Sequence, residues 1–253
     1  MTIHTSKPAA GTTKVALVTG ASRGIGAVIA QRLGADGFAV AVNYVSNAAE
    51  AESVVAAVRA GGAQAIAVQG DVSVAADVAR MFDEVEAAFG GIDVLVNNAG
   101  ILQTMTLQET SDALYERSFA VNTRGTFNTL REAGKRLRQG GRIVNFSSTT
   151  LALNLPGYAI YNATKAAVEA FTHVYAKELR GRQITVNAVA PGPVATELFL
   201  AGKSDAQVAG FAALAPLERL GQPEDIARVV AFLAGPDGAW VNGQVLRANG
   251  GIA

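Results

Sequence analysis

The feature that most constrains this fold is a regular alternation of short apolar runs with longer helical segments, beginning at Lys14. The apolar runs are continuous rather than alternating, which is typical of parallel strands covered on both faces. The expected strands are VALVT (15–19), FAVAVN (38–43), AIAVQ (65–69), IDVLV (92–96), RIVNF (142–146), ITVNAV (184–189) and QVLR (244–247). The expected helices are 24–35, 47–60, 75–89, 111–138, 158–180 and 223–234. This repeat predicts an α/β chain with a Rossmann-type, doubly wound parallel sheet of about seven strands and helices on both faces.

The chain is expected to form one domain over 14–253, because it shows no Pro/Ser-rich linker, long repeat or shift in composition. Residues 1–13 lack the apolar segment of a secretory signal, and we interpret them as a flexible tail. Two connections, 97–110 and about 190–215, are too long for turns. Both leave the carboxyl ends of strands, where open α/β sheets bind ligands.

Composition excludes several classes of protein. Lysine plus arginine and aspartate plus glutamate number 21 each, so neither a nucleic acid nor an anionic membrane is an expected partner. No apolar run reaches the ~18 residues that cross a bilayer, and a cytoplasmic location is expected. The chain has no cysteine, and its histidines are His4 and His173, so no metal site is expected.

A glycine-rich turn joins the first expected strand to the first helix. The stretch VTGASRGIGAVIA contains Gly20, Gly24 and Gly26. Glycines there allow a tight turn and let a pyrophosphate approach the helix N-terminus, where free N–H groups and the helix dipole favour an anion. Placed in the first strand–helix unit, this turn predicts a dinucleotide site.

The end of the second expected strand favours NADP(H) over NAD(H). An NAD site usually has an acidic residue about 20 positions after the glycines, to hold the ribose 2′-hydroxyl. Here the strand ends with Asn43, Tyr44 and Ser46, and the next acid is Glu50. Arg23, within the turn, is suited to a 2′-phosphate.

A rival interpretation of the same turn is a hydrolase. Residues 20–24, GASRG, match the G-x-S-x-G elbow that presents a nucleophilic serine, here Ser22. That interpretation needs an earlier strand for the oxyanion hole and a downstream histidine. Only a short segment precedes the elbow, and His173 lies inside a helical pattern. Both observations weigh against a hydrolase.

The stretch YNATK places Tyr161 and Lys165 one helical turn apart. A phenol with a pKa near 10 is a poor catalyst at neutral pH. An ammonium about 4 Å away in a partly screened site stabilises the phenolate by roughly 3–4 kcal/mol, enough to bring that pKa to about 7–8. The spacing therefore predicts a tyrosine that exchanges protons at neutral pH.

Taken together, these motifs and several others occur in a fixed order. They are TGASRGIG at 19–26, DV at 71–72, NNAG at 97–100, VN at 121–122, serines at 147–148, YNATK at 161–165 and PGPVAT at 191–196. From about Lys14 to the C-terminus the chain resembles the short-chain dehydrogenase/reductase family. The resemblance implies one NAD(P)-binding domain that carries the cofactor and substrate sites.

The resemblance implies four catalytic residues. Tyr161 would protonate the substrate carbonyl oxygen as hydride arrives, and Lys165 would lower its pKa and bind the nicotinamide ribose. Ser148 would hold the substrate oxygen, while Ser147 completes the strand end. Asn122 would steady a water in a proton relay to Lys165.

The resemblance also implies the cofactor contacts. Asp71 and Val72 would meet the adenine, and the 194–196 stretch would fix the carboxamide. The predicted set is Gly20, Ser22, Arg23, Gly24, Ile25, Gly26, Asn43, Tyr44, Ser46, Asp71, Val72, Asn98, Ala99, Gly100, Tyr161, Lys165, Pro191, Gly192, Val194 and Thr196. A homotetramer is also implied, and helices 111–138 and 158–180 suit it because residues such as Phe171, Val174 and Tyr175 give them more than one apolar face.

The two long connections and the segment after Ser148 carry mostly apolar residues that predict the substrate. These residues are Leu102, Met105, Leu151, Leu153, Leu155, Pro156, Leu198, Phe199, Leu200, Phe211 and Leu214. They favour a nonpolar or aromatic ketone or aldehyde. One alternative is a 3-oxoacyl thioester reductase, whose acidic carrier would dock on Arg124, Arg131, Lys135, Arg136 and Arg138. Another is a non-catalytic NADP-binding sensor.

Overall fold

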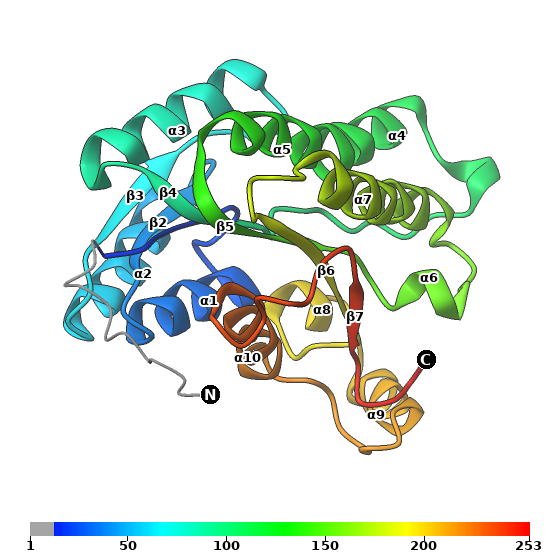
Figure 1. Cartoon of the computed structure of the whole chain (residues 1–253). Helices are drawn as coiled ribbons and strands as arrows, with labels where there is room; N and C mark the ends of the chain where they lie inside the picture. Colours follow the sequence, from blue (N-terminus) through cyan, green and yellow to red (C-terminus); the bar gives the residue numbers. More distant parts are fainter. Residues whose placement is uncertain (1–12) are drawn as a thin grey trace, which may run out of the picture.

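The computed structural model describes residues 13–253, with the side chain of Leu198 left out, so nearly all of the expected tail lies outside the described residues. Seven parallel strands form one sheet in the order β3-β2-β1-β4-β5-β6-β7 (Figure 1). They are β1 (Val15–Val18), β2 (Ala39–Tyr44), β3 (Ala65–Gln69), β4 (Ile92–Asn97), β5 (Leu137–Phe146), β6 (Thr185–Pro191) and β7 (Val245–Ala248). The predicted Rossmann-type sheet is confirmed.

Helices cover both faces of the sheet, and Figure 1 shows the two layers. One face packs against α1 (Gly24–Ala35), α2 (Ala48–Ala60) and α10 (Pro223–Ala234). The other packs against α3 (Ala75–Phe89), α5 (Gly125–Arg136) and α7 (Ala159–Glu178), with α4 (Asp112–Ser118) beside α7. Because both faces are covered, β1 is fully buried and β2, β4 and β6 are nearly so, which explains their largely continuous apolar sequences.

The strand order positions a ligand crevice. The chain builds outward from β1 to β3, then crosses back and builds from β4 to β7 in the opposite direction. The connections that follow β1 and β4 therefore diverge at the carboxyl edge of the sheet, and a crevice opens between them. The glycine turn and the first long connection flank that crevice.

The segment expected as one helix, 111–138, is interrupted in the structure. A π-helical turn, η2 (Phe119–Arg124), separates α4 from α5, and the last two residues belong to β5. The π-turn contains Asn122, whose buried side chain bonds to the connection after β4. Leu137 is buried and pairs with Ile92. The single-helix prediction was wrong because these tertiary contacts outweigh local helix propensity.

The long connections contain short helices that their sequences did not reveal. These are η1 (Leu107–Glu109), α8 (Glu197–Leu200) and α9 (Asp205–Leu214), and a further short helix, α6 (Thr150–Leu153), lies between β5 and α7. Thr196 caps α8 by accepting from the backbone N–H of Phe199, and Ser204 caps α9 in a reciprocal pair with Gln207. The second connection is thus a structured flap over the crevice, which we call the α8–α9 flap (residues 194–215).

Two of the three residues that gave α7 a second apolar face are used within the subunit. Phe171 and Tyr175 pack against the core on the α3 side of the sheet. The Tyr175 hydroxyl donates to Leu130 O at 2.7 Å, and it occupies the space that a Cβ on Gly134 would take. Val174 is 55% exposed. The homotetramer remains a prediction, and these two residues no longer support it.

Candidate active site

A cavity of about 850 Å³ opens at the carboxyl edge of the sheet. Its walls come from the glycine turn, the ends of β2, β4, β5 and β6, the first turn of α7 and the α8–α9 flap. All of the residues predicted for the cofactor or for catalysis line it, with the exception of Asn122. The topology has therefore brought residues of all seven motifs, together with the end of β2, to one place.

The glycine turn adopts a conformation that side chains resist. Gly20 and Gly24 have φ values of +60° and +56°, in the left-handed region that favours glycine. A Cβ on Gly20 would lie 2.8 Å from Ala99 Cα, and one on Gly26 would lie 2.5 Å from Gly20 O. The N-terminus of α1 has no side-chain cap, so its N–H groups face the cavity available for an anion.

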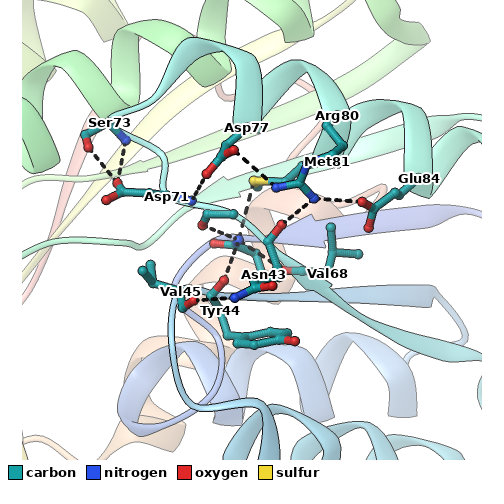
Figure 2. A network of polar contacts seen from close by, with 12 residues as sticks. Asn43, Tyr44, Val45, Val68, Asp71, Ser73, Asp77, Arg80, Met81 and Glu84 are labelled. Atoms are coloured by element: carbon teal, nitrogen blue, oxygen red, sulfur yellow. Dashed lines mark hydrogen bonds and ion pairs between the residues drawn. The ribbon is translucent and has the colours of Figure 1, made fainter.

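Asn43 braces this turn from inside the sheet. Its Oδ1 accepts from Gly20 N at 3.0 Å, and its Nδ2 donates to Gly70 O at 3.0 Å. The same Nδ2 lies 3.2 Å from Val68 O, a contact that can be followed in Figure 2. The residue is 1% exposed. Both side-chain polar atoms of Asn43 are hydrogen-bonded within the protein. We therefore expect this side chain to hold the glycine turn in place rather than to contact a cofactor.

Asn98 holds the same turn from the opposite side. Its Nδ2 donates to Thr19 O at 3.0 Å and to Gly20 O at 2.9 Å, while Ala99 N donates to the Thr19 hydroxyl at 3.1 Å. Gly100 follows, and a Cβ there would lie 3.3 Å from Asn122 Oδ1. The NNAG stretch is therefore packed tightly between the glycine turn and η2.

At the end of β3, Asp71 forms a compact polar corner. One carboxylate oxygen accepts from the backbone N–H and the hydroxyl of Ser73, at 2.8 and 2.6 Å. The Asp71 N–H donates to Asp77, and this bond, with Arg80, lowers the pKa of the Asp77 carboxyl (Figure 2). Arg117, which sequence reasoning missed, lines the cavity 3.7 Å from the other Asp71 oxygen.

Tyr161 and Lys165 enter the cavity from α7 and meet Ser148 at the end of β5. The Lys165 Nζ donates to Phe146 O at 2.8 Å and lies 5.7 Å from the centre of the Tyr161 ring. Lys165 is only 5% exposed. A phenol, a hydroxyl and an amine thus share one water-poor corner of the site.

The expected lowering of the phenol pKa is wrong for these side chains. Burial raises the pKa of Tyr161 to about 12, and the opposing effect of the Ser148 hydroxyl is smaller. Burial also lowers the pKa of Lys165 to about 8. The low-dielectric corner disfavours both charged forms, and the amine contacts a carbonyl oxygen rather than the phenol. Desolvation therefore outweighs the attraction that the four-residue spacing suggested.

Asn122 lies behind the cavity wall, and its side chain is 1% exposed. Its Oδ1 accepts from Ile101 N at 2.8 Å, and its Nδ2 donates to Ile101 O at 2.9 Å and to the Thr164 hydroxyl at 3.1 Å. Asn122 therefore ties η2 to the connection after β4 and to α7. A role in a water relay remains a prediction.

The apolar part of the cavity is smaller than the sequence suggested. Five of the eleven predicted apolar residues line it, namely Leu102, Leu153, Leu155, Phe199 and Phe211. Leu151, Pro156, Met105, Leu200 and Leu214 lie outside the lining, and the last three are exposed. The side chain of Leu198 is not described.

Two aromatic pairs face this part of the cavity. Tyr158 lies edge-on to Tyr161 with ring centres 6.4 Å apart, and Phe199 meets Phe211 at 5.2 Å in the same manner. Sequence reasoning did not assign Tyr158 to the site. Its position three residues before Tyr161, on the same helix face, was the available signal.

The α8–α9 flap contacts the glycine turn across the cavity. A guanidinium nitrogen of Arg23 lies 3.8 Å from a Glu197 carboxylate oxygen, and both side chains are well exposed. A Cβ on Gly24 would lie 3.9 Å from Thr196 Cγ2. Arg23 therefore has a flexible anionic neighbour at the cavity mouth that the sequence did not reveal.

Comparison with known proteins agrees with this geometry. A family model described as enoyl-(acyl carrier protein) reductase matches residues 20–253. A short-chain type dehydrogenase/reductase of Picea abies is 48% identical, covering 94% of this chain and 92% of the relative. The chain belongs to the short-chain dehydrogenase/reductase family.

Two further family members carry informative names. The NADPH-dependent aldehyde reductase-like protein of Arabidopsis thaliana, described as chloroplastic, is 44% identical to this chain. The match covers 96% of this chain and 95% of that protein. The crystal structure of a short-chain dehydrogenase from Burkholderia cenocepacia J2315 in complex with NADP superposes with a TM-score of 0.89. It is 41% identical, and the match covers 94% of this chain and 97% of that one.

Within residues 13–253, no histidine lies beside Ser22, as the hydrolase interpretation of the glycine turn would require. Ser22 lines the cavity, but His173 lies on the exposed side of α7, where its Nδ1 is 3.0 Å from Gly243 O. Over residues 13–253, no group of three histidine or acidic side chains gathers as a metal site would require. Within the same range, no helix has the length and apolar character to cross a bilayer.

The brace formed by Asn43 predicts that Asn43→Asp is strongly destabilising. The new carboxylate oxygen would replace a donor and face two carbonyl oxygens in a buried position, which costs about 3–5 kcal/mol. Urea unfolding without added cofactor measures this loss. The matched control is Asn47→Asp at the exposed N-cap of α2, where aspartate caps equally well. Equal stability of the two variants would show that Asn43 is not a brace.

The lowered pKa of Lys165 predicts a specific dependence of stability on pH. Between the folded pKa of about 8 and the ordinary value of 10.5, the unfolded chain binds more protons, so stability rises with pH. Below pH 8 the whole penalty of burying the ammonium is present. From pH 8 to 10 the wild type should gain about 2 kcal/mol relative to Lys165→Met. Urea unfolding measures this gain, with Lys177→Met, exposed on the same helix, as control. Parallel curves for the wild type and Lys165→Met would contradict the assignment.

Proposed function

We propose that this protein is an NADP(H)-dependent oxidoreductase that reduces a ketone or aldehyde to an alcohol, and catalyses the reverse, with Tyr161 as general acid and base. The observation that carries this proposal is the meeting of Tyr161, Lys165 and Ser148 in a cavity whose far wall is the glycine turn. Residues 14–253 would form one domain containing both the cofactor and the substrate sites.

The residues present fit such a cofactor. The glycine turn allows a pyrophosphate to approach the N-terminus of α1, and side chains at Gly20 or Gly26 would collide with neighbouring backbone. Arg23 and Ser46 would receive the adenosine 2′-phosphate, and no acidic residue stands at the end of β2 to repel it. The complex of the Burkholderia relative with NADP supports this choice.

NADPH, when bound, supplies the hydride that adds to the carbonyl carbon. Tyr161, with its pKa near 12, is a protonated phenol at neutral pH and donates its proton to the carbonyl oxygen. Ser148 hydrogen-bonds the same oxygen and orients it. Lys165, with its pKa near 8, is mostly protonated at neutral pH and stabilises the phenolate that remains.

The raised phenol pKa disfavours alcohol oxidation rather than favouring carbonyl reduction, because an ordinary phenol is already protonated at neutral pH. A phenol that stays protonated is available as an acid through the neutral range, whereas oxidation of an alcohol needs the phenolate as base. Because burial favours the neutral phenol, alcohol oxidation should require a higher pH than carbonyl reduction. Asn122 supports this centre by holding Ile101 and Thr164 around it.

The substrate is proposed to be a nonpolar or aromatic carbonyl compound. Leu153, Leu155, Phe199 and Phe211 line the substrate side of the cavity, and the edges and faces of Tyr158 and Phe211 suit a flat ring. The Arabidopsis relative, named an NADPH-dependent aldehyde reductase-like protein, supports a small carbonyl substrate. A homotetramer and a cytoplasmic location complete the proposal.

The two alternatives receive less support. A carrier-bound acyl thioester would need a basic docking surface, but Lys135, Arg136 and Arg138 are paired with acidic side chains of the same chain. A non-catalytic NADP-binding sensor would have no need for a phenol, a hydroxyl and an amine in one buried corner. Turnover separates these alternatives.

Replacing Tyr161 by phenylalanine should abolish carbonyl reduction while leaving cofactor binding intact. Loss of the proton donor lowers kcat by about 10²–10⁴-fold. NADPH oxidation with a panel of aliphatic and aromatic ketones and aldehydes measures this loss, and NADPH fluorescence measures binding. Tyr115→Phe, at an exposed position on α4 outside the cavity, is the control. Wild-type rates in Tyr161→Phe would refute the mechanism, and an inactive wild type across the panel would favour the sensor.

Replacing Arg23 should change cofactor preference. Arg23→Ala is expected to weaken NADPH binding about tenfold and to leave NADH binding nearly unchanged, because only NADPH carries the 2′-phosphate. Glu197→Gln, which removes the competing carboxylate, should strengthen NADPH binding two- to fivefold. Dissociation constants for both cofactors at several salt concentrations test this, with the exposed Arg180→Ala as control. Equal weakening of both cofactors by Arg23→Ala would exclude the phosphate contact.

A further inference from the structure

One face of α7 is polar where it meets the end of β5. Tyr161, Lys165, Glu169 and Thr172 are spaced by four, four and three residues, which places them on one side of the helix. Lys165 and Thr172 are buried. A polar stripe on the buried side of a helix is unusual, because each group must find a partner to offset its desolvation.

Each member of this stripe has a partner among four consecutive residues, 145–148. Lys165 Nζ donates to Phe146 O at 2.8 Å, and the Tyr161 phenol interacts with the Ser148 hydroxyl. Further along, Asn145 Nδ2 donates to the Thr172 hydroxyl at 2.9 Å. The end of β5 and α7 are therefore joined by a series of polar contacts that extends from the candidate catalytic residues into the core.

The remaining contact of this series joins Ser147 and Glu169. The Ser147 hydroxyl donates to Glu169 Oε1 at 2.6 Å, the short distance that a charged acceptor produces. Ser147 is 3% exposed, whereas Glu169 is half-buried and does not line the cavity. Glu169 cannot reach the substrate, so any effect on the reaction must pass through Ser147, the immediate neighbour of Ser148.

We propose that Glu169 is a positioning residue: by binding the Ser147 hydroxyl from the same helix face as Tyr161 and Lys165, it holds the strand end and the helix in the alignment that brings Ser148 to the phenol. This inference rests on the proposed function of Tyr161 and Ser148. Misplacement of reacting groups by about 1 Å can lower the rate by about 10²-fold. Loss of the Ser147–Glu169 hydrogen bond, which adjoins Ser148, is therefore expected to lower kcat.

Three variants test the contact. Glu169→Ala and Ser147→Ala each remove it, and both should lower kcat about tenfold or more with KM for the carbonyl changed by less than threefold. Glu169→Gln keeps an acceptor oxygen for Ser147 and should restore most of kcat. The double variant should be no slower than either single one, because both changes remove the same bond. Glu178→Ala, exposed on the last turn of α7, is the control.

A second measurement does not depend on turnover. Hydrogen exchange followed by mass spectrometry on the protein without cofactor should show faster exchange over the first turns of α7 in Glu169→Ala and Ser147→Ala, and wild-type rates in Glu169→Gln. A contact that only adds stability would lower Tm and leave kcat per folded molecule unchanged. Should Glu169→Ala fail to fold, Ser147→Ala and Glu169→Gln decide the matter.

The outcomes separate this inference from the proposed function. Wild-type kcat in Ser147→Ala, with Tyr161→Phe inactive, overturns the positioning role alone. Equal losses in Glu169→Gln and Glu169→Ala also overturn it, because the retained hydrogen bond would then have no effect. Full activity in Tyr161→Phe overturns the proposed function itself.

Discussion

The packing of α7 on the end of β5 is the interaction on which the candidate site depends. Through this contact Tyr161 and Lys165, which belong to a helix, reach Ser148, which belongs to the sheet. The strand end is itself fixed by the pairing of β5 with β4 and β6 inside a seven-stranded parallel sheet. A helix contact made of polar groups is directional, so it fixes rotation and register in a manner that apolar packing alone does not.

Desolvation governs the electrostatics of that contact. The buried corner raises the pKa of Tyr161 and lowers that of Lys165, so both groups favour their neutral forms. This burial opposes folding while Lys165 is charged, and it keeps the Tyr161 phenol protonated while making it a weaker acid than a free phenol. Buried groups with strongly shifted pKa values are typical of functional sites.

Three asparagines support the backbone around the glycine turn and the connection after β4. Asn43 and Asn98 bond to the glycine turn from opposite sides, and Asn122 secures the connection after β4. The amide groups of Asn43 and Asn122 each pair with both a donor and an acceptor of nearby backbone, whereas Asn98 donates to two carbonyl oxygens. In these three cases the motif side chains bond to backbone at or beside the cavity, and their contact with a cofactor or a water relay remains a prediction.

The sequence by itself determined the parallel sheet, its seven strands, the glycine turn and the group of motifs at the crevice, because these depend on local periodicity and on residue type. The tertiary structure alone decided the break at η2, the flap helices α8 and α9, the pKa values of Tyr161 and Lys165, and the contact of Ser147 with Glu169. Each of these depends on which groups from distant segments share a buried volume. Spacing along a helix shows which side chains are neighbours, but the dielectric around them and the partners across the sheet are set only when the chain has folded.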